Sequence, residues 1–117
     1  MDRLMNALFG LTPKVRYAAV YRHGELSLRQ RPGLSLASAP ESDRYEELLV
    51  NPTVLTLTRQ RGDIDCGGLD YVVVRYGNFF QFVAPIAGGH VSVAFESDAD
   101  PIGHAQEVLG TIQMHLM

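Results

Sequence analysis

The sequence predicts an α+β fold, a two-layer domain in which helices pack across a five-stranded antiparallel sheet. Residues 66–98 contain three apolar runs rich in β-branched and aromatic residues, each closed by a turn, which predicts a three-strand meander. Residues 14–31 contain two shorter runs around a tight turn, which predicts a hairpin. Helical patterns precede, separate and follow these strands. The predicted order is α-β-β-α-β-β-β-α in a single domain spanning residues 1–117.

The first element is a short amphipathic helix at residues 2–9, because its apolar residues recur at helical spacing. Gly10 and Pro13 end this helix. The apolar face consists of Leu4, Met5, Leu8 and Phe9.

The hairpin follows at residues 14–21 and 25–31, joined by the turn Arg22-His23-Gly24-Glu25. Pro32-Gly33 ends its second strand. Strict alternation in the first strand places four residues on one side: Val15, Tyr17, Ala19 and Tyr21.

A central helix is expected from about Ala39 to Gln60. Ser38 and Glu41 have the spacing of a capping box, with Ser38 as the N-cap and Glu41 at the third helical position. The apolar residues that follow at helical spacing are Tyr45, Leu48 and Leu49.

Asn51-Pro52 allows three continuations of this helix. The pair can kink one long helix, or end it and start a second helix capped by Asn51. Residues 53–59 also alternate Leu and Thr, as a strand would. The i, i+3, i+4 spacing through the segment favours a helix to about Gln60, and Gly62 is then expected to end it.

The third strand of the sheet is expected at Leu69–Tyr76, followed by strands in NFFQFVAPIAGG and HVSVAFESD. Alternation in the fourth strand places Phe80 and Phe82 on one face and Phe79 on the other. The last helix is expected to start with Asp100 as its N-cap and Pro101 at its first position.

Composition argues against several classes of function. The formal charge of −3 provides no basic excess for nucleic acid. A single cysteine cannot form an internal disulfide, and the first residues lack the apolar run of a signal peptide. No window is long and apolar enough to cross a bilayer. We therefore expect a cytoplasmic protein that binds no nucleic acid and does not insert into membranes.

Candidate chemistry in the sequence is sparse. Cys66 precedes two glycines and makes an enzyme using Cys66 with His90 conceivable, but no Cys-His spacing of a known catalytic type is present. Glu96, Asp98 and Asp100 lack the glycine and the distal acid of a calcium loop. The sequence therefore predicts no enzyme activity, no metal site and no cofactor.

The element order resembles the roadblock/dynein light chain family, which has a profilin-like, longin-related architecture. The resemblance is carried by the glycine turn before His90-Val91-Ser92-Val93-Ala94 and by the acidic segment Asp98-Ala99-Asp100-Pro101 before the last helix. It implies a non-enzymatic regulator. Family members form homodimers by pairing their third strands and packing their second helices, and in bacteria they often bind or regulate a Ras-like small GTPase.

If this chain dimerises as family members do, the resemblance implies that its central helix and third strand form the dimer interface. Leu69–Val74 is apolar on both faces, which suits either an edge strand that pairs with a second subunit or a strand central in the monomer's own sheet. The suspected interface residues are Tyr45, Leu48, Leu55, Leu69, Tyr71, Val73 and Arg75.

An alternative function is a small-molecule-sensing domain of the same profilin-like shape. In that case a pocket between the sheet and the helices would hold the ligand. Its expected lining is Tyr17, Tyr21 and Phe82.

Overall fold

The computed structural model describes residues 1–116 and contains the predicted five-stranded antiparallel sheet. The strand order is β2-β1-β5-β4-β3. The strands are β1 (Val15–Arg22), β2 (Glu25–Gln30), β3 (Val72–Arg75), β4 (Phe79–Ile86) and β5 (Gly89–Glu96). The helices are α1 (Asp2–Phe9), α2 (Pro40–Tyr45), the π-helical turn η1 (Glu46–Val50), α3 (Asn51–Asp65) and α4 (Ala105–Leu116). The predicted element order is confirmed.

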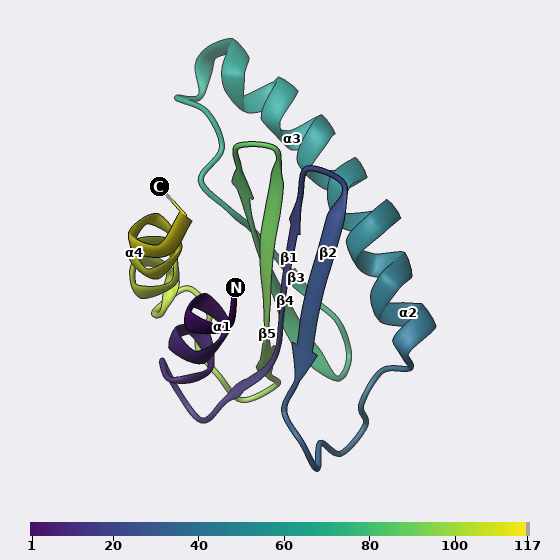
Figure 1. Cartoon of the computed structure of the whole chain (residues 1–117). Helices are drawn as coiled ribbons and strands as arrows, with labels where there is room; N and C mark the ends of the chain where they lie inside the picture. Colours follow the sequence, from purple (N-terminus) through teal and green to yellow (C-terminus); the bar gives the residue numbers. More distant parts are fainter. Residues whose placement is uncertain (117) are drawn as a thin grey trace.

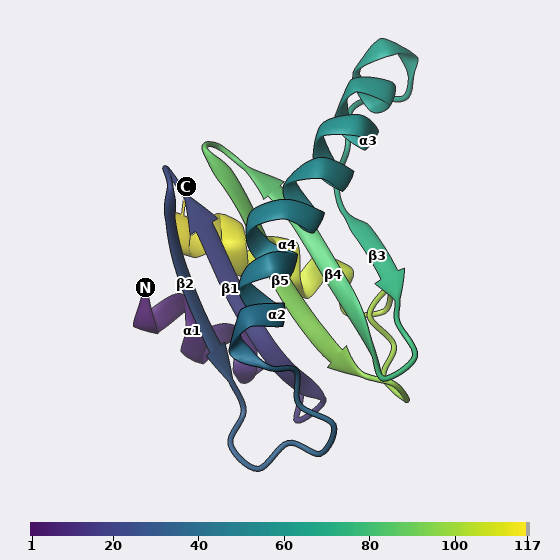
Figure 2. The same ribbon diagram turned by 90° about the vertical axis from the view of Figure 1, so that its right-hand side faces the viewer.

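Helices cover both faces of the sheet, so the molecule has three layers where the sequence predicts two. Figure 1 shows α1 and α4 together on one face and the continuous helix α2-η1-α3 on the other. Figure 2 shows that this continuous helix runs diagonally across the strands of the sheet.

The apolar core lies between the sheet and the pair α1 and α4. Phe82 and Phe95 meet edge-to-face at its centre, with ring centroids 6.5 Å apart. The predicted alternation in β4 is confirmed, because Phe80 and Phe82 join this core whereas Phe79 lies on the opposite face. The helices contribute Leu4, Met5, Leu8, Ala105, Val108 and Ile112.

The hairpin turn has positive φ at both central residues, 52° at His23 and 81° at Gly24. Such a turn matches the right-handed twist of the two strands. The predicted alternation fails at the start of β1, where the pairing with β5 shifts register between Val15 and Tyr17. This bulge turns Val15 to the α1 and α4 side, whereas Tyr17 lies on the other face.

The central helix continues through Asn51-Pro52, as its i, i+3, i+4 spacing favours, so the alternatives of a strand or of a break at this point are wrong. The π turn η1 immediately precedes Pro52, whose missing N–H and bulky ring disturb a regular α-helix. A wider turn at this point accommodates the proline, and the helix proceeds as α3.

Both ends of the central helix differ from the prediction. Ala39 is the N-cap and Pro40 is the first helical residue, with no side-chain cap, so the capping box of Ser38 and Glu41 does not form. At the other end α3 runs through Gly62 to Asp65. The helix ends where Gly67 and Gly68 take φ values of 79° and 91°.

Two later elements are shorter than expected. The third strand covers only Val72–Arg75 instead of Leu69–Tyr76, because its pairing with β4 begins at Val72 and ends at Arg75. Asp100 caps a turn and not a helix, since its Oδ1 accepts a hydrogen bond from the Gly103 N–H at 3.0 Å. Helix α4 begins after this turn.

Candidate functional site

An edge strand and an exposed apolar helix face adjoin on one side of the molecule. The sheet order places β3 at an edge, so the alternative of a central third strand is wrong for the subunit. Large apolar side chains are exposed along the outer face of α2-η1-α3 at spacings typical of one helix face. They are Tyr45, Leu48, Leu49, Leu57 and Ile64. We call these five residues the helix stripe.

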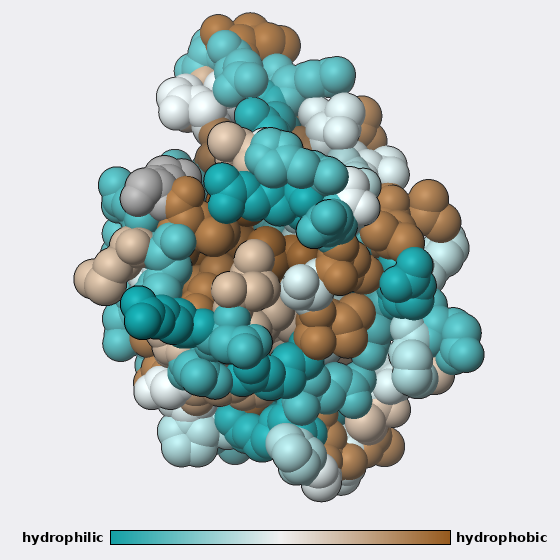
Figure 3. All heavy atoms as spheres, in the orientation of Figure 1, coloured by the Kyte–Doolittle hydropathy of each residue, from teal (hydrophilic) through white to brown (hydrophobic). Residues whose placement is uncertain are grey.

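The far end of α3 projects beyond the sheet. Figures 1 and 2 both show its last turns beyond the ends of the strands. Leu57 is 63% exposed and Ile64 is 75% exposed, so α3 carries apolar side chains that the subunit itself does not cover. Figure 3 shows apolar residues at the surface along the side where α2 and α3 lie and at the tip of α3.

The structure divides the suspected interface residues between several environments. Tyr45 and Leu48 are exposed on the helix stripe, whereas Leu55 is buried on the inner face of α3. Leu69 is half-buried before β3 begins. Three of the set turn toward the α1 and α4 side: Tyr71 stacks on Phe82 with centroids 4.9 Å apart, Val73 packs against the core, and Arg75 lies over the Phe80 ring.

Register places Val72 and Val74 on the opposite side of β3 from Val73. Val72 pairs with Val83 and Val74 pairs with Gln81, which belong to the face covered by α2-η1-α3. Both valines are half-buried. They are therefore the β3 side chains on the face of the sheet that α2-η1-α3 covers.

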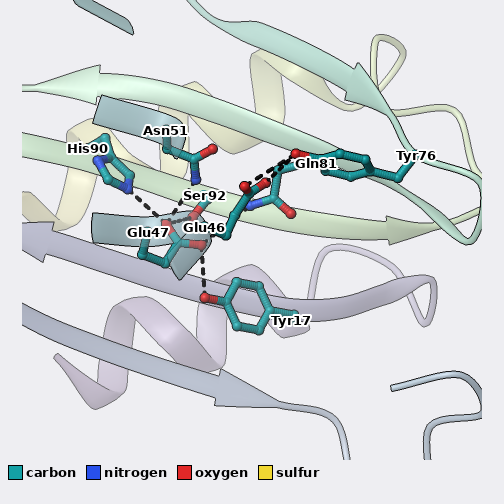
Figure 4. Close-up of polar contacts among 8 residues, drawn as sticks. All are labelled: Tyr17, Glu46, Glu47, Asn51, Tyr76, Gln81, His90 and Ser92. Carbon is teal, nitrogen blue, oxygen red and sulfur yellow. Dashed lines mark hydrogen bonds and ion pairs between the residues drawn. The ribbon is translucent and has the colours of Figure 1, made fainter. Parts of the chain in front are cut away.

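Beneath the central helix, the carboxylate of Glu47 is the centre of a buried polar network (Figure 4). Glu47 is 0% exposed, although it lies on a helix with many solvent-facing residues. Its Oε1 contacts Asn51 Nδ2 at 3.0 Å, His90 Nε2 at 2.8 Å and Ser92 Oγ at 2.5 Å, and its Oε2 contacts Tyr17 Oη at 2.8 Å and Gln81 Nε2 at 3.4 Å. These donors come from α3 and from three strands, so one carboxylate ties the helix to the sheet.

Two further carboxylates lie beside this network. The Tyr76 hydroxyl donates to Glu46 at 2.9 Å, and the Gln30 amide donates to Asp43 Oδ2 at 2.7 Å. Burial raises the pKa of both carboxyls above the ordinary value, and the nearby Glu47 charge adds to the effect. Burial likewise raises the pKa of Tyr76 to about 12, assisted by its bond to Glu46. The pKa of Tyr17 is also raised, by burial and by the adjacent Glu47.

The structure does not bring Cys66 and His90 together. Cys66 is exposed after the end of α3, and its thiol contacts Asp65. His90 is buried against Glu47. Within residues 1–116 no group of His, Cys, Asp or Glu side chains is arranged to hold a metal ion, and no helix is long and apolar enough to cross a membrane.

A cavity does lie between the sheet and α2-η1, on the side of the β3-β4 turn. Tyr17 lines it, as expected for a sensing pocket, but the other two expected residues do not. Phe82 is in the core on the opposite face, and Tyr21 lines a separate depression beside α3.

Sequence reasoning missed Glu47, Asp43 and Glu46, because acids on an amphipathic helix ordinarily face water. A signal existed in the strands. Gln81, His90 and Ser92 occupy positions between buried apolar residues, and buried polar groups need partners.

The fold is similar to several solved structures. A Roadblock/LC7 domain from Streptomyces avermitilis has 21% sequence identity and a TM-score of 0.72, covering 100% of this chain and 98% of that one. The gliding protein MglB from Thermus thermophilus has 15% identity and a TM-score of 0.64, covering 97% and 87%. MglB in a tetrameric arrangement has 16% identity and a TM-score of 0.64, covering 92% and 79%.

These similarities confirm the predicted roadblock-type fold over nearly the full chain. At the level of sequence, no family model and no curated protein matches the chain.

Proposed function

We propose that this chain is a non-enzymatic regulatory module of the roadblock type, which forms a homodimer and binds a Ras-like small GTPase. The observation that carries the proposal is the position of the β3 edge beside the helix stripe. An edge strand offers unpaired backbone groups to another strand, and an apolar helix face offers a surface that gains from being covered.

Homodimerisation would satisfy both features at once. If β3 pairs with β3 of a second copy around a two-fold axis, the two sheets become continuous and the same patch is used on each subunit. The outer face of α3, with Leu57 and Ile64, would then lie over the partner's sheet edge near Val72 and Val74. Covering these side chains stabilises the pair by the hydrophobic effect.

The proposal of a non-enzymatic role is supported by the state of the chain's most reactive groups. Glu47 already accepts hydrogen bonds from several donors in a fully buried site. The Cys66 thiol is exposed and contacts the Asp65 carboxylate, with no histidine among its described hydrogen-bond partners. Neither group is placed as a nucleophile or as a general base.

The GTPase part of the proposal comes from the resemblance to the roadblock family, whose fold this chain shares with a solved Roadblock/LC7 domain. The test uses the purified chain with a Ras-like GTPase encoded in the same genome and loaded with a fluorescent GTP analogue. We expect the two proteins to co-elute and the rate of nucleotide hydrolysis or release to change. Separate elution with unchanged rates for every such GTPase would contradict this part, whatever the oligomeric state.

A further inference from the structure

The cavity between the sheet and α2-η1 has the size of a small-molecule site. Its volume is about 350 Å³, within the range of roughly 300–1,000 Å³ that ligand pockets occupy. Figure 4 shows Tyr17, Glu46, Tyr76 and Gln81 around the space between helix and strands. Aromatic rings form part of the wall, with the Tyr76 and Phe79 centroids 5.3 Å apart.

The cavity wall carries more negative than positive charge. Asp43, Glu46 and Glu47 line it, and Arg16 is its one basic residue among those described. Arg16 is already occupied, because its guanidinium contacts Glu96 at 2.7 Å and two backbone carbonyls. Among residues 1–116, no ion pair includes Asp43 or Glu46.

Asp43 has an unused acceptor at this wall. The residue is 9% exposed, and its Oδ2 accepts the hydrogen bond from Gln30. No side chain or backbone group within residues 1–116 donates to its Oδ1. This oxygen is therefore free to accept a charge-assisted hydrogen bond from a cationic group in the cavity.

Glu46 offers the second carboxylate. Both of its oxygens contact only the Tyr76 hydroxyl among the described donors, at 2.9 and 3.2 Å. Burial raises the pKa of Asp43 and Glu46, so the folded protein holds both in surroundings that disfavour their charge. A bound positive charge reverses that preference.

We propose that this cavity binds a small organic cation, an amine, amidine or guanidine on an apolar body. The cationic group lies between Asp43 and Glu46, and the apolar body lies against Tyr17, Tyr76 and Phe79, whose ring faces also attract cations. The described residues contain no metal-binding group here, which favours an organic cation over a metal ion. This site does not depend on dimerisation or on a GTPase.

The test is an NMR titration of the labelled chain with 2-phenylethylamine, benzamidine, agmatine and spermidine. At least one cation should shift the amides of Ser42, Gly77 and Asn78 saturably below about 10 mM, the weak end of specific affinity. The neutral 2-phenylethanol and the anionic 3-phenylpropionate serve as matched controls. The proposal is overturned if no cation shifts these amides, or if the neutral and anionic controls bind equally well.

Variants then locate the contact. Glu46→Gln and Asp43→Asn keep side-chain size and should each weaken the bound cation by about tenfold, because each removes one charge-assisted hydrogen bond. Glu41→Gln, on the same helix but exposed and outside the cavity, should leave the affinity unchanged. The spectrum of each variant reports whether it is folded. A folded Glu46→Gln variant that binds as tightly as the wild type would refute the site.

Discussion

Glu47 occupies a place where an apolar residue would ordinarily stabilise the contact between a helix and a sheet. The apolar cluster on this face is small, consisting of Tyr17, Ala19 and Ala94. The helix is instead held by the hydrogen bonds that Glu47 accepts. Buried polar networks of this kind contribute less to stability than to a single orientation of the packed elements.

Glu47→Gln should therefore destabilise the fold despite its similar size. The amide nitrogen cannot accept, so in either orientation it would face a donor: the Tyr17 hydroxyl in place of Oε2 or the Ser92 hydroxyl in place of Oε1. We expect a loss of about 2–4 kcal/mol in the free energy of unfolding, measured by urea denaturation. Glu41→Gln, which is exposed on α2, should change it by less than about 0.5 kcal/mol. Equal effects of the two variants would contradict the account of the network.

Asp43 and Glu46 predict a pH dependence of stability. Burial raises their pKa in the folded protein above unfolded values of about 4, so the folded state binds more protons in the window between the two. Their stabilising contribution is complete below the unfolded pKa and is lost as pH rises through the folded pKa. Urea unfolding from about pH 4 to pH 7 should show a smaller decline in the Asp43→Asn, Glu46→Gln double variant than in the wild type. If the free energy of unfolding declined equally with pH in both proteins, the raised pKa values of Asp43 and Glu46 would be contradicted.

At the residue scale, the sequence indicates that buried polar residues of the strands need hydrogen-bond partners. It does not indicate which acidic residue is that partner. His90 and Ser92 are two apart and so share a face of β5, where each would need a buried partner. The sequence contains thirteen acids, and no local pattern distinguishes Glu47 from its neighbours. Glu47 is buried because its side chain lies between the helix and strands β1 and β5, an arrangement that only the tertiary fold brings about.

At the element scale, the type of each helix and strand is predictable from local patterns, whereas several ends are not. The alternation of β4 and the turn at Gly24 are local, and both are confirmed. The end of α3 depends on a contact with a later segment. Gly62, which a local reading takes as a helix stop, is buried inside α3 against the backbone of Gly68.

Gly62→Ala tests this contact. A Cβ at residue 62 would lie 2.7 Å from the Gly68 carbonyl oxygen, and backbone cannot move aside as a flexible side chain does. We expect a destabilisation of about 1–3 kcal/mol, even though alanine favours helices over glycine.

Gly110→Ala is the matched control, since it lies inside α4 with nothing within 4 Å of the added Cβ. It should stabilise the protein by about 0.5–1 kcal/mol. Thermal unfolding of both variants separates the two effects, and a stabilised Gly62→Ala variant would show that the close contact is not rigid.

At the scale of the whole molecule, the two helical layers differ in chemistry. The side with α1 and α4 buries a continuous apolar core, whereas the side with α2-η1-α3 combines a polar inner face with the helix stripe outside. The helical periodicity of apolar residues ordinarily predicts that they face the sheet. Here Leu49 and Leu57 point outward, which the sequence alone does not reveal.

The helix stripe predicts which substitutions dissociate the proposed dimer. Leu57→Glu places a charge in the proposed interface without disturbing the subunit core, because the side chain is exposed. Ile102→Glu makes a comparable change at an exposed position before α4 and outside the helix stripe. We expect a weaker dimer only for Leu57→Glu, measured by light scattering, with circular dichroism to establish that both variants are folded. Equal dissociation, or none, would place the interface elsewhere.

Self-association of the wild-type chain decides whether a second copy covers the β3 edge and the helix stripe, as proposed. Sedimentation equilibrium from about 1 to 100 μM spans the affinities expected of a specific interface. We predict a species of twice the 12.9 kDa subunit mass. A strictly monomeric 12.9 kDa species throughout this range would contradict the proposed dimer.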